Sequence, residues 1–267
     1  MSAKMQTVTI RGEEIEYLKY GNGKRNLIMI QGLSFIKLSG SIPRRERMAS
    51  FYGDDFTVYF VERRDDMKKG TTTREMASHV AEFMDEMGIE SATVVGFSQG
   101  GMLAQWLGID YPEKVDALVL TVTYARPNVM SRAVTVWSDL LKAEEFEHFT
   151  RLCMFMSYSP DWLYRNKDAK LHIPAPENRR SAEQYEVCAE ACIDHNTYDL
   201  LDKIKCPVLA IGGKIDLVVG LEGTNDFVEK LGCESVVYDN MGHGLYEEDP
   251  DFHNKVYAWL KKTICGA

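Results

Sequence analysis

A chain of 267 residues is long enough for one large domain or for a core that carries an insertion. Its formal net charge of −9 argues against sequence-independent nucleic-acid binding, which needs a basic face. The first residues, MSAKMQTVTI, lack a basic segment followed by an apolar run, and no stretch reaches the roughly 18 apolar residues of a membrane span. We therefore expect a cytoplasmic protein without a membrane span, either a monomer or a homodimer.

The first residues predict a hairpin, and later strands predict a mostly parallel sheet. Val8 and Ile10 alternate with polar residues, as do Ile15 and Tyr17, and RGEE between them supplies a turn. The runs that follow are apolar at nearly every position, which is typical of strands buried on both faces. These runs are Asn26 to Gly32, Phe56 to Glu62, Ala92 to Gly96, Asp116 to Val122, Cys206 to Gly213 and Glu234 to Asp239.

Helical patterns separate these strands. Between Thr72 and Gly88 the apolar residues share one helix face, Thr72 is placed to cap the start, and Glu75 occupies the capping-box position. Three similar patterns follow, at Gln99 to Pro112, Leu221 to Gly232 and Asp249 to Thr263. This alternation predicts the α/β class, with helices on both faces of a mostly parallel sheet and antiparallel strands at the N-terminus.

The alternation stops between about Tyr124 and Lys203. Four helical patterns without a clear strand occur there, at residues 129–142, 144–159, 159–166 and 181–196. We therefore predict a core made of residues 1–123 and 204–267, and a helical cap insertion made of residues 124–203.

The six cysteines are scattered, and we expect them to be reduced thiols. Cys188 and Cys192 have the i, i+4 spacing that half a metal site would have. No matching pair of ligands lies nearby in the sequence, so two cysteines on one buried helix face is the favoured interpretation. No metal and no organic cofactor is expected.

Ser98 lies in Gly96-Phe97-Ser98-Gln99-Gly100, a G-x-S-x-G pattern between an apolar strand and a helix. So sharp a turn strains the serine backbone, and glycines two positions away remove the side chains that would clash. The turn would raise the hydroxyl above the sheet edge at a helix N-terminus, which favours developing negative charge. The alternative is a serine that only caps the helix.

A nucleophilic serine needs a base, and His243 is the best placed of the six histidines. It follows the last core strand, and the glycines on both sides give its loop freedom to reach over the sheet. The other histidines fit packing, surface or pocket-lining roles: His79, His148, His172, His195 and His253.

The imidazole in turn needs a carboxylate to orient it. Asp216 follows the strand that ends near Gly212. The other usual position for such an acid, after the strand ALVLTV, reads TYARPN and holds none. Asp226 is the competing carboxylate, but it lies within a predicted helix.

With these residues in the order Ser98, Asp216, His243, the sequence strongly resembles the α/β-hydrolase superfamily over nearly its whole length. The resemblance implies the α/β-hydrolase fold, a catalytic triad, and an oxyanion hole formed by the backbone N–H groups of Leu33 and Gln99. The usual histidine before the glycine of the oxyanion segment is Gln31 here, whose side chain can still hydrogen-bond to the loop backbone.

The resemblance implies a serine hydrolase, esterase- or lipase-like, that cleaves a carboxylic ester or related acyl bond of a small, hydrophobic substrate. Aromatic residues of the insertion and near Ser98 are candidates for the substrate pocket, although most of them can equally dock the insertion onto the core. These candidates are Phe35, Phe97, Trp137, Phe155 and Trp162.

The sequence leaves other interpretations of the function open. The same triad supports acyltransferase, perhydrolase or C–C hydrolase chemistry, and a ligand receptor without efficient turnover can also retain it. Seven basic residues have the charge to select an anionic substrate, but a solvated face is the favoured interpretation. They lie in two expected loops: Arg44, Arg45 and Arg47 in the first, and Arg63, Arg64, Lys68 and Lys69 in the second.

Overall fold

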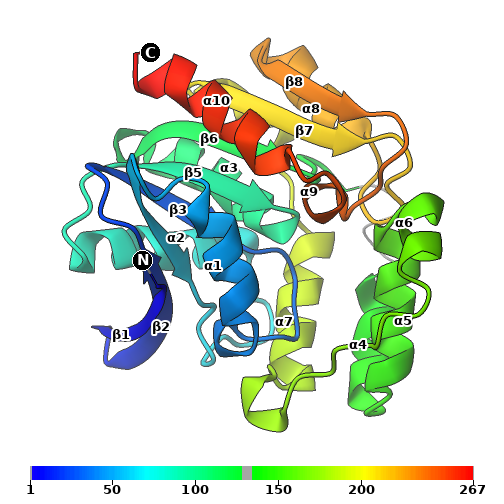
Figure 1. Cartoon of the computed structure of the whole chain (residues 1–267). Coiled ribbons are helices and arrows are strands. Elements are labelled where there is room, and N and C mark those ends of the chain that lie inside the picture. Colours follow the sequence, from blue (N-terminus) through cyan, green and yellow to red (C-terminus); the bar gives the residue numbers. More distant parts are fainter. Residues whose placement is uncertain (1, 128–133, 267) are drawn as a thin grey trace.

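The computed structural model describes residues 2–127 and 134–266, and an eight-stranded sheet forms its centre (Figure 1). The strand order is β1-β2-β4-β3-β5-β6-β7-β8, in which β1 and β2 are antiparallel to their neighbours and the remaining pairs are parallel. The predicted fold class is confirmed. The strands are β1 (Lys4–Ile10), β2 (Glu13–Tyr20), β3 (Arg25–Ile30), β4 (Phe56–Val61), β5 (Ala92–Phe97), β6 (Val115–Thr121), β7 (Val208–Gly213) and β8 (Glu234–Tyr238).

Local sequence explains the strand layout. Every residue of β4, β5 and β7 is buried, as the continuous apolar runs indicated. Arg11 and Gly12 join β1 to β2 with φ values of 52° and 86°, the positive pair that a tight hairpin turn requires. In the parallel part, Ile30 aligns with Gly96 and Phe97 with Thr121, so the carboxyl ends of β3, β5 and β6 meet at one edge.

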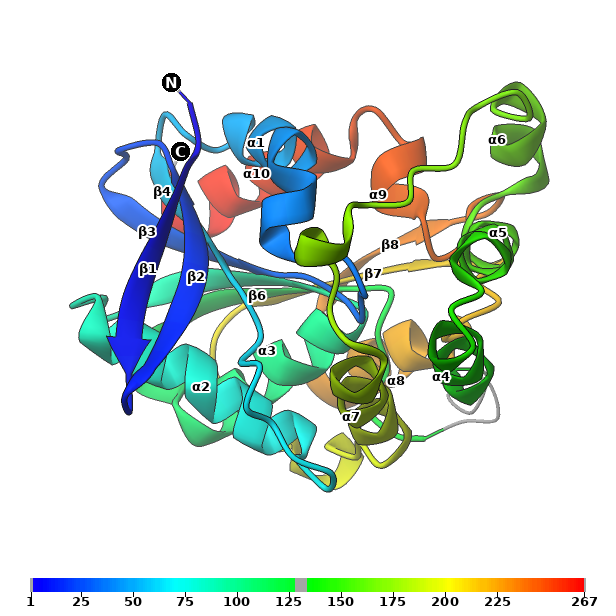
Figure 2. The same cartoon turned by 90° about the horizontal axis from the view of Figure 1, so that it is seen from below.

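Helices cover both faces of the sheet (Figure 2). Two of them, α1 and α10, lie on one face, and α2, α3 and α8 lie on the other. Thr72 caps α2 in a capping box with Glu75, as predicted. The bounds are α1 (Ile42–Ser50), α2 (Thr73–Glu86), α3 (Gln99–Asp110), α8 (Glu222–Leu231) and α10 (Phe252–Ile264).

Within the part of the chain that the structure describes, four further α-helices lie between β6 and β7 and beside the carboxyl-end edge of the sheet (Figures 1 and 2). We call them the helical insertion: α4 (Val134–Lys142), α5 (Phe146–Ser157), α6 (Pro160–Arg165) and α7 (Ala182–Ile193). Helix α4 packs against both α5 and α7. The predicted helical pattern at 129–142 begins outside the described residues, since these resume at residue 134.

Among the described α-helices, two were not predicted: α1 and the short α9 (Leu245–Glu248). In α1 the buried face consists of Arg45, Met48 and Ala49, so a charged residue interrupts the apolar stripe that marks an amphipathic helix. The expectation of a loop is therefore wrong for residues 42–50. The expectation of a solvated face is wrong for three of the seven basic residues, whereas Arg47, Lys68 and Lys69 are exposed as expected. Arg45, Arg63 and Arg64 are all buried, with 5%, 8% and 8% of their surface exposed.

Candidate active site

The turn between β5 and α3 holds Ser98 in a strained conformation. Its φ is 53° and its ψ is −120°, and its backbone N–H donates to the Thr121 carbonyl at 2.9 Å. A Cβ on Gly96 would lie 2.5 Å from the Gly100 oxygen, and one on Gly100 would lie 2.0 Å from the Ile30 oxygen. Both glycines of the motif are therefore required by close packing around the serine.

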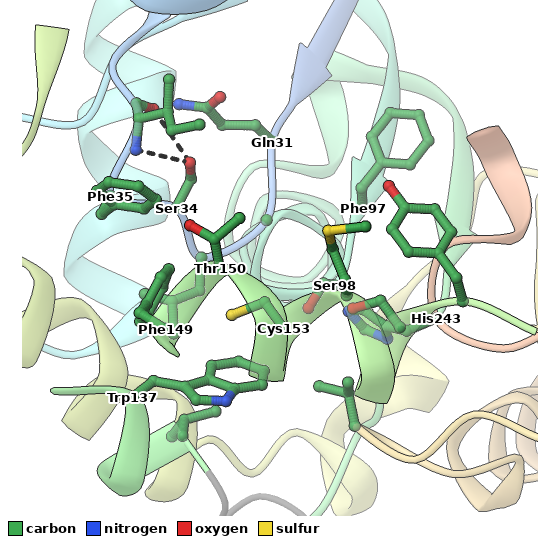
Figure 3. A pocket seen from close by; sticks show the side chains of 18 of the residues that line it. Gln31, Ser34, Phe35, Phe97, Ser98, Trp137, Phe149, Thr150, Cys153 and His243 are labelled. Atoms are coloured by element: carbon green, nitrogen blue, oxygen red, sulfur yellow. Dashed lines mark hydrogen bonds between the residues drawn. The ribbon is translucent and has the colours of Figure 1, made fainter. Parts of the chain in front are cut away.

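Ser98 lines a cavity instead of capping its helix. Within the described residues, its side chain makes no capping hydrogen bond to α3, and it lies on the wall of a cavity of about 480 Å³. This argues against the helix-cap interpretation. Figure 3 shows Ser98 close to His243, which lines the same cavity.

His243 and Asp216 form a buried pair. His243 Nδ1 lies 2.9 Å from Asp216 Oδ2, and the histidine is 9% exposed. The other carboxylate oxygen, Oδ1, accepts the backbone N–H groups of Val218 at 2.8 Å and Val219 at 2.9 Å. These amides fix the carboxylate, and the carboxylate orients the imidazole, so Nε2 is left for other chemistry.

The glycines beside His243 serve close packing rather than loop freedom, which corrects the sequence interpretation. A Cβ on Gly244 would lie 2.5 Å from the Tyr158 ring, and the Gly244 N–H donates to the Ser157 carbonyl at 2.7 Å. A Cβ on Gly242 would lie 2.9 Å from the Ser157 oxygen. The histidine loop is thus held against the end of α5, in the helical insertion.

The expected oxyanion-hole residues, Leu33 and Gln99, both belong to segments next to the serine: Gln99 follows it in the chain, and a Cβ on Gly32 would lie 3.1 Å from Ser98 Cβ. Leu33 lines the cavity, and Gln99 is the first residue of α3, where backbone N–H groups lack partners within the helix. Within residues 2–127 and 134–266, neither backbone N–H donates to another protein group. Both are therefore available to an anionic oxygen.

Gln31 bonds to side chains and not, as expected, to the loop backbone. Its Nε2 donates to Glu62 Oε1 at 3.2 Å, and its Oε1 accepts from Arg45. Arg63 Nη2 donates to the Gln31 carbonyl at 2.7 Å and lies 3.4 Å from Gln99 Oε1. A buried polar network thus supports the segment that carries Leu33.

Sequence reasoning missed this network, although a signal for it was present. Glu62 and Arg63 directly follow β4, and a strand's carboxyl end is where functional side chains gather in such sheets. Glu62 Oε1 also accepts from Arg180 at 2.8 Å, and Glu62 Oε2 accepts the Leu38 N–H at 2.6 Å. The network therefore ties the chain just before α7 to the core.

Four of the five expected pocket residues line the cavity: Phe35, Phe97, Trp137 and Trp162. Phe35, Trp137 and Phe149 gather on the side opposite Ser98 and His243 (Figure 3). Phe35 also packs edge-on against Phe149 at 4.8 Å, so these rings both line the cavity and dock α5 on the core.

Phe155 does not line the cavity, and the prediction is corrected. It is 63% exposed, because α5 turns Phe149, Cys153 and Met154 to the cavity and Phe155 to the outside. Tyr246, which the sequence reasoning overlooked, lines the cavity and packs against Phe97 with the ring centroids 4.7 Å apart and the planes tilted by 49°.

The competing residues have other partners. Asp226 on α8 pairs with Arg126 at 2.7 Å. His195 is buried against Thr73 and Gln105, and His253 against Tyr52. The surface histidine His148 contacts Glu145, and His172 lines the cavity at an exposed position.

Cys188 and Cys192 are buried free thiols on α7. Their burial fits the interpretation that favoured one buried helix face. Among the described residues, no three His, Cys, Asp or Glu side chains are grouped so that they could hold a metal ion. None of the described helices combines the length and apolar character that crossing a bilayer requires.

A sequence model of the α/β hydrolase fold matches residues 39–250. The chain belongs to the α/β hydrolase fold family. One relative is the 3-oxoadipate enol-lactonase 2 of Acinetobacter baylyi, 21% identical with 96% of each chain covered. Another is a putative carbamate hydrolase of a Caulobacter species, 27% identical over 68% of this chain and 70% of the relative.

Solved structures of this family share the arrangement of elements. An enol-lactonase from Burkholderia xenovorans superposes with a TM-score of 0.76 at 19% identity, covering 96% of this chain and 99% of the other. A hydrolase from a deep-sea metagenome library superposes with a TM-score of 0.82 at 19% identity, covering 95% and 96%. At such identities the structural likeness establishes the α/β hydrolase fold. The similar proteins named above are hydrolases.

Proposed function

We propose that the protein is a serine hydrolase that cleaves a carboxylic ester or a related acyl bond of a small, largely apolar substrate. The observation that carries this proposal is the 2.9 Å contact between Asp216 Oδ2 and Nδ1 of His243, a residue that lines the same cavity as Ser98. Asp216 accepts a hydrogen bond from the protonated Nδ1, which fixes the tautomer in which the lone pair of Nε2 is free to act as a base.

In the first half of the reaction, Ser98 Oγ attacks the substrate carbonyl carbon and its proton passes to His243 Nε2. The carbonyl oxygen becomes an anion, and the backbone N–H groups of Leu33 and Gln99 stabilise it. The bond to the leaving group then breaks, and the imidazolium returns its proton to the departing alcohol. An acyl-Ser98 ester remains.

In the second half, His243 takes a proton from water, and the hydroxide so formed attacks the acyl-Ser98 carbonyl. The same two amides hold the oxyanion. The ester bond to Ser98 breaks, Ser98 recovers its proton from the imidazolium, and the carboxylic acid leaves. Asp216 stays ionised throughout and stabilises the imidazolium each time it forms.

The names of the relatives support the proposal that an ester or related acyl bond is hydrolysed. They are named as an enol-lactonase, a putative carbamate hydrolase and several esterases, such as one from Thermogutta terrifontis. Each name denotes hydrolysis at an acyl carbon. The cavity supports the apolar part of the proposal, because aromatic and sulfur-bearing side chains such as Phe35, Trp137 and Met102 line it.

The test is labelling with a fluorophosphonate, which reacts only with activated serines, beside turnover of p-nitrophenyl esters from acetate to palmitate. Wild type should be labelled and active, and Ser98→Ala should show neither. Ser78→Ala is the matched control, since Ser78 lies on α2 and its hydroxyl donates to the Glu75 carbonyl of the same helix. Labelling that persists in Ser98→Ala would refute the assignment of the nucleophile.

The same experiment separates the alternatives. An acyl-enzyme burst without steady-state turnover would instead indicate a receptor. If products form preferentially with added alcohols or peroxide, the triad serves an acyltransferase or a perhydrolase. If p-nitrophenyl esters are inert but a vinylogous diketone is cleaved, the enzyme is a C–C hydrolase.

A further inference from the structure

The charged side chains on the cavity wall are of one sign. Among the described residues that line the cavity, the basic ones are Arg44, Arg45 and Lys170, and none is aspartate or glutamate. The whole chain has 40 acidic and 31 basic residues. In an acidic protein, a cavity wall whose charged lining side chains are all basic favours an anionic ligand.

Arg45 is the most unusual of these cations because it is buried without a counter-ion. It is 5% exposed, its Nη2 donates to the neutral Gln31 side chain, and its Nη1 lies 3.8 Å from Met48 Sδ. Within residues 2–127 and 134–266, no carboxylate lies within 4.0 Å of its guanidinium. A buried charge without an opposite partner is costly, and a bound anion would remove that cost.

Two further observations show how little compensation Arg45 receives. The carboxylate of Glu62 is already engaged by Arg180 and by the Leu38 N–H. Burial, followed by repulsion from the neighbouring Arg44, lowers the pKa of the Arg45 guanidinium to about 10. The group is still charged at neutral pH, so the positive charge persists in the cavity wall.

Arg44 differs, because its charge is balanced outside the cavity. Its Nη2 pairs with Glu247, whose other oxygen accepts from the Tyr158 hydroxyl at 2.9 Å. Arg44 is therefore fixed in place, and it lines the same cavity as Arg45. The two adjacent arginines of α1 offer a charged wall close to the Gln31–Leu33 segment.

We infer that the substrate carries a carboxylate remote from the bond that is cleaved, and that this carboxylate binds at the wall formed by Arg44 and Arg45. This inference rests on the proposed function, and it makes the substrate an amphiphile: apolar toward Phe149 and Trp137, anionic toward α1. The flat guanidinium of Arg45 suits a carboxylate, which it can contact through more than one N–H group.

The test compares esters that differ only in this charge. One series places it on the acyl side: the mono-p-nitrophenyl ester of adipic acid against its methyl-capped diester. The other places it on the leaving group: 4-carboxyphenyl butyrate against its methyl ester. In at least one series, kcat/KM of wild type should favour the carboxylate by about 10- to 100-fold, as expected for a charge-assisted contact. Equal rates in both series, or preference for the neutral esters, would overturn the inference.

Substitutions on α1 test which side chain is responsible for the preference for the carboxylate ester. Arg45→Gln should reduce the charged-to-neutral ratio of kcat/KM to within about threefold of unity, whereas Arg45→Lys should retain part of it. The ratio does not depend on the amount of folded enzyme, so it remains informative if Arg45→Gln folds poorly. Arg47→Gln is the matched control, because Arg47 is exposed on the same helix and outside the cavity wall. A ratio unchanged in Arg45→Gln would also overturn the inference.

The two proposals fail in different ways. If no ester of either series is turned over and Ser98 resists fluorophosphonate, the hydrolase proposal itself fails. If the neutral esters are cleaved in a Ser98-dependent way without a preference for carboxylates, the hydrolase stands and the anionic subsite is refuted.

Discussion

The two sides of the cavity are built on different principles. On the sheet side, Ser98, Asp216 and His243 follow strand ends, and backbone groups fix them, as when Val218 and Val219 donate to Asp216. On the side of the helical insertion, Phe149 and Trp137 are held mainly by ring contacts with other side chains. The wall on the sheet side fixes the relative positions of the proposed catalytic groups. The wall on the insertion side sets the shape and volume of the cavity, which can change without moving those groups.

The two sides meet at the histidine loop. The Gly244 N–H donates to the Ser157 carbonyl, and the buried Glu248 accepts both the backbone N–H and the hydroxyl of Ser159. The insertion is therefore attached next to the proposed base. Substitutions on each side, and at this junction, can show how independent the two walls are.

The largest effect is expected on the sheet side, from Asp216→Asn. The Asn oxygen would keep accepting from Val218 and Val219, so its NH₂ group would face His243 Nδ1. That forces the tautomer with a proton on Nε2, which cannot act as a base. We expect kcat for p-nitrophenyl butyrate to fall about 10⁴-fold, with the melting temperature little changed.

The control for this variant is Asp226→Asn on α8, which loses the ion pair with Arg126 but should retain full turnover. If Asp226→Asn were the inactive variant and Asp216→Asn the active one, the proposed orienting acid would be wrong.

The junction should give the next largest effect. Glu248→Ala leaves the Ser159 N–H and hydroxyl without their acceptor, which is expected to lower the free energy of unfolding by about 1–3 kcal/mol. Because α6 begins beside Ser159, KM should rise more than kcat falls. Urea denaturation and steady-state kinetics measure the two effects.

Glu229→Ala, on the exposed face of α8, provides the comparison for the lost carboxylate. If KM in Glu248→Ala matched this control, the junction would stabilise the fold without positioning the cavity wall.

A substitution in the wall formed by the helical insertion should alter which acyl-chain length is preferred and not the chemical step. Trp137→Ala removes a ring that is 6% exposed and opens the cavity away from Ser98, so the acyl-chain optimum should lengthen by a few carbons. Discrimination between adjacent chain lengths in such pockets is about tenfold. Phe155→Ala, which removes a ring pointing outward from the same insertion, should leave the optimum unchanged. An equal shift in both variants would indicate a general loosening of the insertion.

The same division explains what the sequence could predict. The strands and the mostly parallel character of the sheet could be predicted from strongly apolar runs. The ends of these strands predicted where Ser98, Asp216 and His243 lie without reference to any distant contact. The cavity wall depends on which side of a helix faces inward, and the pattern of α5 did not reveal that Phe155 points outward. The cavity wall depends also on buried arginines. The sequence predicts that Arg45 and Arg63 are exposed, because their hydrogen-bond partners, Gln31 and Gln99, are distant in the chain.

The smallest predicted effect concerns the point where the insertion rejoins the core. Burial lowers the pKa of His195 to about 3, from the ordinary value of 6.5. Below pH 6.5 the unfolded chain therefore binds a proton that the folded chain does not, and stability falls with decreasing pH down to the folded pKa. Between pH 7 and pH 6 this amounts to on average half a proton, or about 0.7 kcal/mol.

His195→Gln should remove this dependence while retaining a hydrogen bond to Thr73, so its unfolding free energy should change less between these two pH values than that of wild type. His148→Gln, at an exposed position on α5, should leave the difference as it is in wild type. Since His253 is also buried, with a pKa lowered to about 4, some pH dependence should persist in His195→Gln. A pH dependence equal to that of wild type would show that His195 takes up its proton without unfolding, and hence that this end of the insertion opens more readily than the sheet it joins.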